Sequence, residues 1–513
     1  MLARIFDNKW IYIEQITAQE ESTLDKEFSV RHPRQQYLDL SSGFFDGVYH
    51  KYNKAHHRLA RPLLGELKRV CDKHGMPLMV RDERGPAKHL MPDPATITKD
   101  YLHNIILDDH QVEAIQVCCK EEVGTISCKT GGGKTEMMAG IAKAYNCPTV
   151  ILCDMTVVVD QIKERLELRK AAEEIGMFYA GKRPNGQQII VGSFQSLIIP
   201  PPPDHLKKDT PESYAKKMAA WKTRRNNAKK LREIIARCEL LLVDECDCAV
   251  SAQWKNLFWH WFKGRYRFGF SGTPYDKSKP VQAIVLKEHL GSVIFHVGKD
   301  RLEEIHRIIP VDYIAIAFGD EGLIKDKSAF DIAVQEHLIG NTQFHSLVAK
   351  LVAKCTRGDP THGVLILVES KPLGYALELA IAGSKFICGD HSMKDRKEAI
   401  KNFESRHVNV LIGGKIVKRG MDLKGGCETL IIATGGKLES DFSQKLGRAV
   451  RVNKRGHATI YDFFFLCNHY LYDHSRSRIR AVASMGYDAK IVFKNGVVDV
   501  YKFIRSRFRR PKY

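Results

Sequence analysis

The sequence predicts an α/β protein with two tandem parallel-sheet domains, a small α+β N-terminal domain and a short basic C-terminal extension. The first observation is an alternation, from about residue 100, of short β-branched runs such as "VGTISC" and "CELLLVDE" with helical stretches. The second is the return of this alternation after about residue 310, in "GVLILVES", "VNVLIGG" and "ETLIIAT". Such alternation is typical of doubly wound parallel sheets. We therefore predict domains at residues 1–95, 96–300, 301–470 and 471–513.

The composition favours a polyanionic partner and argues against a membrane-spanning, secreted or zinc-binding protein. The 513 residues carry a net charge of +20, a balance typical of nucleic-acid-binding proteins. No apolar run reaches the roughly 18 residues of a membrane span, and the charged start "MLARIFDNKWIYIEQ" lacks the apolar core of a signal peptide. The 13 cysteines lack zinc-site spacing, and we attribute Cys246 and Cys248 to strand packing. We therefore expect a reduced, cytoplasmic protein that is monomeric and has no membrane partner.

The predicted N-terminal domain combines strands, one helix and a basic surface. The runs "KWIYIEQI" and "QQYLDLSSGFFDGVY" have strand character, and "RPLLGELKRVCDKHG" has helical apolar spacing that stops at Gly75. Cations hold backbone phosphates and aromatic rings stack on unpaired bases, so this domain is expected to contact nucleic acid. For Phe44 or Phe45 alone, filling a small hydrophobic core is an equally good interpretation. The expected contacts are Arg31, Arg34, Phe44, Phe45, Tyr49, Lys51, Lys54, Arg58 and Arg61.

Two further basic segments interrupt or follow the predicted sheets. The insert at residues 200–235 starts with four prolines and continues as "AKKMAAWKTRRNNAKKLREIIAR". It is either a phosphate-backbone contact or a solvated connecting helix. Residues 471–513 contain eleven Lys and Arg against three acids, with a hairpin signal at Asn495 and Gly496. The residues of this tail that we expect to bind nucleic acid are Arg505, Arg507, Arg509 and Arg510.

The stretch "SCKTGGGKT" has the composition of a phosphate-binding loop. It follows the strand candidate "VGTISC" and precedes the helix candidate "KTEMMAGIAKAY", the setting that such a loop requires. Consecutive glycines let backbone N–H groups converge on phosphate oxygens at a helix N-terminus. Lys134 would neutralise the β- and γ-phosphates of ATP, and Thr135 would offer its hydroxyl to Mg²⁺. The predicted loop residues are Thr130, Gly131, Gly132, Gly133, Lys134 and Thr135.

A carboxylate pair completes the predicted nucleotide site. In "LLLVDECD", Asp244 and Glu245 follow an apolar strand about 110 residues after Lys134. Asp244 is expected to hold Mg²⁺, directly or through water, and Glu245 to orient and deprotonate the attacking water. The loop and the carboxylates together predict an ATP hydrolase.

The run "DECD" after "LLLV", with the glycine loop upstream, resembles the DExD/H box of superfamily 2 helicases and translocases. The resemblance extends over about residues 100–465 and implies two RecA-like domains with a nucleic-acid-dependent ATPase. "LDDHQVEAI" is similar to the adenine-reading segment of this superfamily, which implies that Gln111 contacts the base. The first loop position is commonly alanine in these proteins, so Cys128 is acceptable there.

The remaining motifs are similar to those that contact the strand or close the second domain over the nucleotide. "VILCDMTVVVDQ" and "VGSFQSL" resemble motif Ia and the next strand-contacting motif, "FSGTP" resembles motif III, and "GVLILVES" resembles motif IV. "GGKIVKRGMDLK" and "QKLGRAVR" resemble motifs V and VI, and an arginine fork of motif VI delivers positive charge to a shared γ-phosphate. The residues implied are Thr156, Gln195 and Ser196 for nucleic acid, Gly420 and Asp422 for nucleotide, and Gln444, Arg448 and Arg451 for catalysis.

One stretch of the predicted N-terminal domain resembles a particular group within this superfamily. "SSGFFDGVYHKYNKAHHRLARPLLGELKRVCDKHG" is similar to the N-terminal domain of UvsW-like bacteriophage helicases, with Val48 where that family has a basic residue. This implies a DNA helicase of recombination, repair and replication that unwinds and branch-migrates Holliday junctions, forks and displacement loops, in the host bacterial cytoplasm for a phage protein. It also implies that residues 1–95 select the junction. A protein starting near Thr96 would then keep its ATPase and lose that selection.

Two other interpretations stay open. One is a different motor, either an RNA helicase or the DNA translocase of a restriction complex; "DECD" and "SGTP", in place of D-E-A-D and S-A-T, favour DNA. The other is a DNA-binding scaffold with a vestigial ATPase. The intact set of Lys134, Asp244, Glu245, Arg448 and Arg451 disfavours the scaffold.

Overall fold

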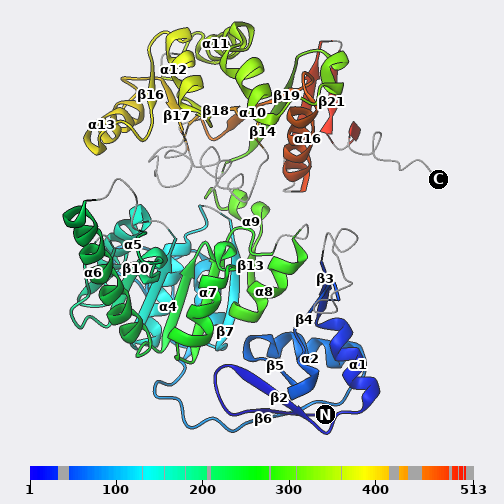
Figure 1. The fold of residues 1–513 in the computed structure, drawn as a ribbon, viewed down its shortest axis with the longest axis vertical. Helices are drawn as coiled ribbons and strands as arrows, with labels where there is room; N and C mark the ends of the chain where they lie inside the picture. Colours follow the sequence, from blue (N-terminus) through cyan, green and yellow to red (C-terminus); the bar gives the residue numbers. More distant parts are fainter. Residues whose placement is uncertain are drawn as a thin grey trace. The chain divides into compact units, whose positions relative to one another are not determined.

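Two compact units make up the chain in the computed structural model (Figure 1). The first comprises Met1–Lys129 and Gly133–Val297, and the second comprises Thr130–Gly132 and Gly298–Tyr513. None of the described helices is long and apolar enough to cross a membrane. The structure describes residues 1–32, 46–129, 131–154, 156–179, 181–204, 210–275, 279–307, 309–359, 361–414, 427–436, 453, 455–484, 488–494, 496–500 and 502–503.

The first unit is built on a seven-stranded parallel sheet in the order β13-β7-β12-β11-β8-β10-β9. The central strands are buried along almost their whole length, as the sequence predicts for a parallel sheet, and "VGTISC" forms β7. The strands are β7 (Val123–Cys128), β8 (Thr149–Cys153), β9 (Ile175–Phe178), β10 (Ile189–Ser193), β11 (Leu240–Asp244), β12 (Tyr266–Ser271) and β13 (Val293–Val297). The helices are α3 (Asp109–Cys118), α4 (Lys134–Tyr145), α5 (Thr156–Leu168), α6 (Pro211–Ile235), α7 (Ala252–Asn256) and α8 (Pro280–Leu290).

A smaller mixed sheet, in the order β5-β2-β1-β6, forms the N-terminal region of the same unit. The predicted helix is present as α2, and Gly75 follows it with φ +63°, a left-handed conformation that glycine adopts readily. The strands are β1 (Leu2–Ile5), β2 (Trp10–Glu14), β5 (Arg58–Ala60) and β6 (Met79–Asp82), beside the pair β3 (Ser29–Arg31) and β4 (Val48–His50). The helices are α1 (Ala18–Glu27) and α2 (Leu64–Lys73).

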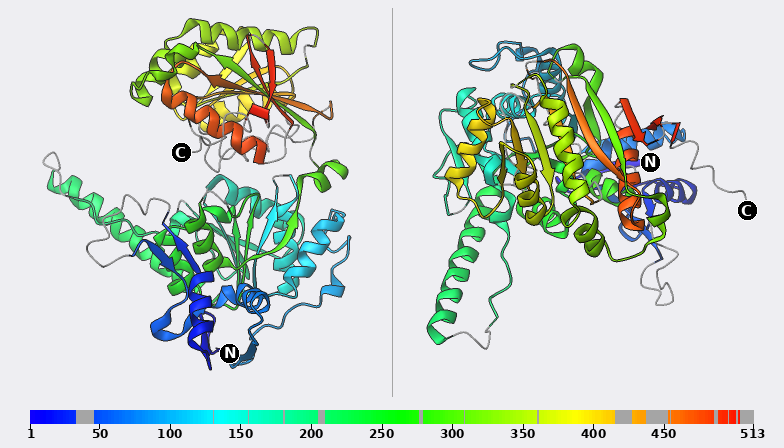
Figure 2. Two further views of the ribbon diagram at one scale, coloured as in Figure 1. Left: turned by 90° about the vertical axis from the view of Figure 1, so that its right-hand side faces the viewer. Right: turned by 90° about the horizontal axis from the view of Figure 1, so that it is seen from above.

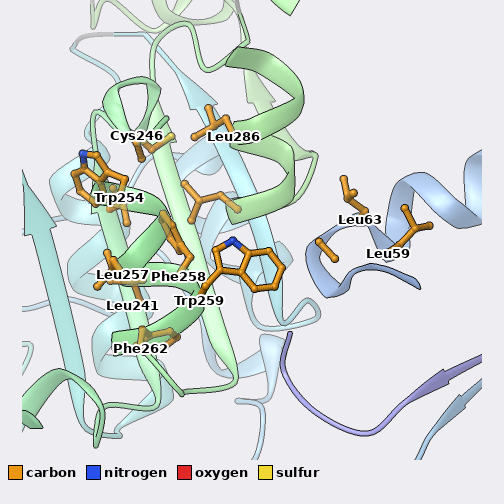
Figure 3. Close-up of a cluster of buried hydrophobic side chains, with 14 of the residues drawn as sticks. Leu59, Leu63, Leu241, Cys246, Trp254, Leu257, Phe258, Trp259, Phe262 and Leu286 are labelled. Carbon is orange, nitrogen blue, oxygen red and sulfur yellow. The ribbon is translucent and has the colours of Figure 1, made fainter. Parts of the chain in front are cut away.

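The N-terminal region and the seven-stranded sheet share one hydrophobic core. Leu59 and Leu63 face Trp259 and Leu286 across their boundary (Figure 3). The rings of Trp10 and Trp259 lie 4.5 Å apart between centroids, which adds a direct aromatic contact. The N-terminal region is therefore packed as part of the first unit.

The second unit contains an eight-stranded sheet in the order β16-β17-β15-β18-β19-β14-β20-β21, parallel except for the final pair. The strands are β14 (Val311–Phe318), β15 (Val364–Val368), β16 (Ser384–Ile387), β17 (Val410–Gly413), β18 (Thr429–Ala433), β19 (Ala458–Phe465), β20 (Asp488–Phe493) and β21 (Gly496–Asp499). The helices are α9 (Lys299–Glu304), α10 (Phe330–Val334), α11 (Thr342–Thr356), α12 (Lys371–Ala380), α13 (Met393–Glu404) and α16 (His469–Ser484). Two parallel-sheet domains of the predicted class are thus present.

The structure differs from the sequence prediction at the C-terminal boundary. Helix α16 crosses the predicted boundary at residue 470, and β20 pairs with β14 in the sheet. Strand β21 then pairs antiparallel with β20, which is the hairpin that Asn495 and Gly496 predict. Much of the segment after residue 470 therefore belongs to the second unit, because its alternating apolar residues complete the edge of that sheet.

Candidate functional site

The glycine loop joins β7 to α4 at the carboxyl end of the first sheet. Gly131 and Gly133 have φ of +94° and +80°, the left-handed region that disfavours residues with a Cβ. A Cβ on Gly133 would lie 2.0 Å from Nε2 of Gln111, so the close approach also requires glycine. Lys134 opens α4, where the free N–H groups of the first turn favour an anion. The strand, loop and helix therefore form the setting of a phosphate site, and Thr130 lies outside the described residues.

Gln111 is placed by a capping box at the start of α3. The backbone N–H of Asp108 donates to Oε1 of Gln111 at 3.0 Å, and Gln111 is 2% exposed. Its amide group faces the glycine loop through Gly133. Adenine contact by Gln111 stays a prediction, since the side chain is also used to begin the helix.

The carboxylates of "DECD" lie beside the glycine loop. Asp244 ends β11, and Glu245 follows with φ +46°, an uncommon conformation for a residue with a side chain. Nζ of Lys134 donates to Oε1 of Glu245 at 2.5 Å. Burial lowers the pKa of Lys134, but Glu245 and Asp244 outweigh it and raise that pKa above its ordinary value. The fold thus brings Lys134 into one charged cluster with Asp244 and Glu245, which lie more than 100 residues later in the sequence.

One carboxylate oxygen of Asp244 lacks a hydrogen-bond partner within this cluster. Its Oδ1 is buried and accepts no hydrogen bond from any residue that the structure describes. Burial raises the pKa of Asp244 to about 6, and the charge of Lys134 only partly opposes this shift. A buried carboxylate oxygen without a partner is costly, and a cation or an ordered water would satisfy it.

The residues at this position fit Mg²⁺ as a companion of a nucleotide. Magnesium takes oxygen ligands and usually binds through one or two protein groups plus phosphates. Asp244 offers the unpartnered oxygen, and Thr135 lies on the first turn of α4. Among the residues with assigned positions, no group of three or more His, Cys, Asp or Glu could hold a metal alone. Asp244 and Thr135 are therefore the residues that would hold it.

Sequence reasoning missed the link between "DECD" and "FSGTP". Oγ of Ser271, at the end of β12, donates to Oδ1 of Asp247 at 2.8 Å, and the backbone N–H of Thr273 donates to Oγ of Ser271 at 3.2 Å. Burial raises the pKa of Asp247 to about 6. The signal in the sequence was the second aspartate of "DECD", which follows the end of β11 by three residues.

Cys128 occupies the position where the phosphate-loop pattern has its first glycine. Its side chain is fully buried at the end of β7. Burial raises the pKa of Cys128 to about 11, so the thiol stays neutral beside Lys134. A small uncharged side chain satisfies this position.

The predicted nucleic-acid residues of the first unit lie at neighbouring strand ends. Thr156 is exposed at the start of α5 after β8, and Gln195 is exposed on the short helix η5 (Phe194–Leu197) after β10. Strands β8 and β10 pair directly, and Nε2 of Gln195 donates to Oδ1 of Asp154 at 3.0 Å. Ser196 is half-buried beside Gln195. The structure brings these residues to one edge, and their contact with nucleic acid stays a prediction.

Several predicted residues lie outside the described part of the chain, so their roles stay predictions. They are Gly420, Asp422, Gln444, Arg448, Arg451, Arg505, Arg507, Arg509 and Arg510, together with Arg34, Phe44 and Phe45 of the N-terminal region.

Four basic residues of the N-terminal region, which the sequence predicts to contact nucleic acid, instead contact acidic or aromatic residues of the protein. Lys51 pairs with Glu288 at 2.6 Å, Arg61 with Glu122 at 2.6 Å, and Lys54 with Asp25 at 2.8 Å. The guanidinium of Arg58 lies 4.0 Å from the centroid of the Trp10 ring. These four cations have partners inside the protein because the region packs against acidic and aromatic residues of its own unit. Arg31 is exposed, and Tyr49 is half-buried beside His32.

Two known families match the chain, and together they cover more than half of it. The family described as "Type III restriction enzyme, res subunit" matches residues 104–276, which contain the glycine loop and "DECD". The family described as "Helicase conserved C-terminal domain" matches residues 348–453, which contain the segments similar to motifs IV, V and VI.

Individual proteins are similar over parts of the chain. A protein of Sulfolobus islandicus filamentous virus whose name describes it as a helicase is 22% identical over 250 residues, 46% of this chain and 44% of that protein. This chain therefore spans less than half the length of that relative. The structure of UvsW from bacteriophage T4 covers 96% of this chain and 99% of its own at 15% identity, with a TM-score of 0.41.

A restriction-modification enzyme of known structure gives a fold comparison. LlaBIII, an ATP-dependent type ISP restriction-modification enzyme bound to DNA, covers 82% of this chain and 32% of its own at 12% identity, with a TM-score of 0.51. At this identity the likeness concerns the fold alone.

Proposed function

Because the chain belongs to the superfamily 2 helicases, we propose that it is an ATP-dependent DNA helicase that unwinds and branch-migrates branched DNA. The helicase domains themselves imply ATP binding and a nucleic-acid-dependent ATPase. The choice of DNA, and of Holliday junctions, forks and displacement loops among DNA structures, is the part that we propose.

The ion pair between Lys134 and Glu245 is the observation that supports the ATPase most directly. A γ-phosphate that binds the glycine loop competes with Glu245 for Lys134, because both are anions within reach of one ammonium group. Loss of the pair leaves Glu245 free to accept a hydrogen bond from water and to take its proton. Bound Mg²⁺ would add charge neutralisation at the phosphates. We propose that Arg448 and Arg451 supply further positive charge to the γ-phosphate.

The preference for DNA rests on separate support. The first unit matches a restriction-enzyme family, the motor segments read "DECD" and "SGTP", and the net charge is +20. We propose branched DNA because the N-terminal stretch resembles that of UvsW-like helicases.

A second candidate is a DNA translocase that moves along duplex without separating its strands. The match of residues 104–276 to the type III restriction family favours it. Displacement of a third strand from a triplex, without unwinding of a fork or junction, would identify this activity.

The test is steady-state ATP hydrolysis with no nucleic acid, single-stranded DNA, linear duplex, a four-way junction and RNA. We expect the four-way junction to stimulate the most and RNA the least. Glu245→Gln should bind ATP and hydrolyse it poorly, while Glu121→Gln, at an exposed position, serves as the control. Equal stimulation by RNA and DNA would contradict the DNA assignment, and equal stimulation by linear duplex and junction would contradict the branched substrate.

A further inference from the structure

Helix α6 projects from the first unit, as both views of Figure 2 show. It has 25 residues, so it is about 37 Å long. Its buried residues are Ala228, Leu231 and Ile235, all in its last third. The first two thirds thus extend beyond the core, beside the four-proline segment that precedes them. We call residues 200–204 and 210–235 the arm.

The base of the arm is fixed to the segment that carries Gln195 and Ser196. Nε and a terminal nitrogen of Arg232 donate to the carbonyl of Leu197, at 3.0 and 2.7 Å. The same guanidinium lies 3.9 Å from the ring centroid of Trp261. Higher on the arm, Nε1 of Trp221 donates to the carbonyl of Pro200 at 2.9 Å. These contacts hold the arm in a set direction relative to the edge predicted to contact nucleic acid.

The arm is strongly basic and exposed. It carries eight Lys and Arg in α6 against two Glu. Lys216, Lys222, Arg224, Lys229 and Lys230 are all exposed, and none forms an ion pair with a residue that the structure describes. Lys222 and Lys229 are seven residues apart, and Lys216 and Lys230 fourteen, so each pair lies on one side of the helix. Along the helix axis, Lys222 and Lys229 are about 10 Å apart, and Lys216 and Lys230 are about 20 Å apart.

The apolar and aromatic side chains of the arm indicate which kind of partner its positive charge would bind. No large apolar side chain is exposed on the described residues of the arm, so a protein partner would find little apolar surface to bury. The indole N–H of Trp221 is already bonded, and the ring is half-buried, so stacking on unpaired bases is also disfavoured. Lysine ammonium groups without aromatic or apolar neighbours suit the phosphates of a duplex, read without regard to sequence.

We propose that the arm binds the phosphate backbone of a DNA duplex next to the strand held at the edge formed by Thr156, Gln195 and Ser196. This inference rests on the proposed function, because it places the duplex beside a motor that acts on DNA. It adds a second surface for contact with DNA and gives the arm a role in forming that surface.

The test compares two variants with equal loss of charge. In the arm variant, Lys216→Gln, Lys222→Gln, Lys229→Gln and Lys230→Gln are combined. In the control, Lys68→Gln, Lys120→Gln, Lys350→Gln and Lys401→Gln neutralise four exposed lysines elsewhere. Glutamine and lysine have similar helix propensity, so circular dichroism should show unchanged helix content. The dissociation constant for a linear DNA duplex, a single DNA strand of equal length and an RNA duplex is measured over a range of salt.

We expect the arm variant to bind the DNA duplex at least tenfold more weakly than the control. The slope of log K against log salt should be shallower by about 2 to 4, since each lost phosphate contact removes about 0.9. Affinity for the single strand should fall less. Equal slopes in the two variants, or a loss confined to RNA duplex, would overturn the arm proposal while leaving the motor intact. A parent protein that binds no nucleic acid would overturn the proposed function itself.

Discussion

The N-terminal region and the α6 arm are both basic in sequence, but their cations have different surroundings. In the N-terminal region, Lys51, Lys54 and Arg61 each lie within 2.8 Å of a carboxylate oxygen. In the arm, lysines such as Lys222 and Lys229 are exposed and form no ion pair with the described residues. An excess of positive charge in a segment therefore indicates a polyanionic partner only where the fold brings no carboxylate to it.

Glu122 shows how far the N-terminal cations are committed to the protein itself. It precedes β7 and accepts from Arg61 at 2.6 Å, Arg84 at 2.8 Å and Arg265 at 2.6 Å. Burial opposes the ionisation of Glu122, but the three guanidinium groups outweigh it and hold its pKa below the ordinary value. The N-terminal region is thereby tied to the strand that leads to the glycine loop.

The largest expected effect comes from removing residues 1–95. A protein that starts at Thr96 would expose the apolar residues, Trp259 and Leu286 among them, that the N-terminal region covers (Figure 3). We expect it to aggregate or to melt well below the full chain, as shown by thermal unfolding and light scattering. Supplying residues 1–95 as a separate chain should restore solubility. A monodisperse fragment with the parent's ATPase would mean that the region is separable, as the sequence predicts.

Lys134 differs from the cations of both basic regions, because it is paired with Glu245 and is expected to exchange that partner for a γ-phosphate. Lys134→Ala should lower ATP turnover by roughly 10³-fold, the scale of losing a cation at a transferring phosphate. Steady-state hydrolysis with saturating DNA measures this, and Lys120→Ala, at an exposed lysine, is the control. Turnover within twofold of the parent would remove Lys134 from the site.

Glu122→Gln tests whether the N-terminal cations need their carboxylate. We expect the free energy of unfolding to fall by about 3 kcal/mol, because three guanidinium groups lose a shared, largely buried partner. The neighbouring Glu121 is exposed, so Glu121→Gln should change it by less than about 0.5 kcal/mol. Equal denaturation midpoints for the two variants would show that the Glu122 cluster contributes little.

Asp244 is the opposite case, a buried carboxylate without enough partners. Its folded pKa of about 6 lies above the ordinary 3.8, so its contribution to stability is full below pH 4 and is lost as the pH rises through 6. Without nucleotide, Asp244→Asn should therefore raise the free energy of unfolding at pH 8 by about 3 kcal/mol and change it little at pH 4. Denaturant unfolding at the two pH values measures this. A variant that is less stable than the parent at pH 8 would contradict the assignment.

The smallest effects concern single lysines. Lys54→Gln should change duplex affinity by less than twofold, because Lys54 is already paired with Asp25. Lys222→Gln should weaken binding severalfold and make the salt slope shallower by about 1. Fluorescence titrations over a range of salt compare them. If Lys54→Gln costs as much as Lys222→Gln, the distinction between the two basic regions fails.

Local patterns made the sheets and the nucleotide cluster predictable, whereas the surroundings of charged residues were not. The strand "VGTISC" forms β7 and "LLLVD" forms β11, because burial on both faces leaves an apolar run in the sequence. The pairing of Arg61 with Glu122 depends on how two sheets pack, and no local spacing records it. The bond between Asp247 and Ser271 was missed for the same reason, since it joins the turn that follows β11 to the end of β12.

ATP-dependent branch migration of a four-way DNA junction tests the central claim most directly. The full chain is mixed with a labelled junction, with ATP, without ATP, and with Lys134→Ala in place of the parent. We predict that the parent converts the junction to duplex products only with ATP, and that Lys134→Ala binds the junction and leaves it unchanged. A parent that hydrolyses ATP in the presence of the junction and yet forms no product would contradict the claim.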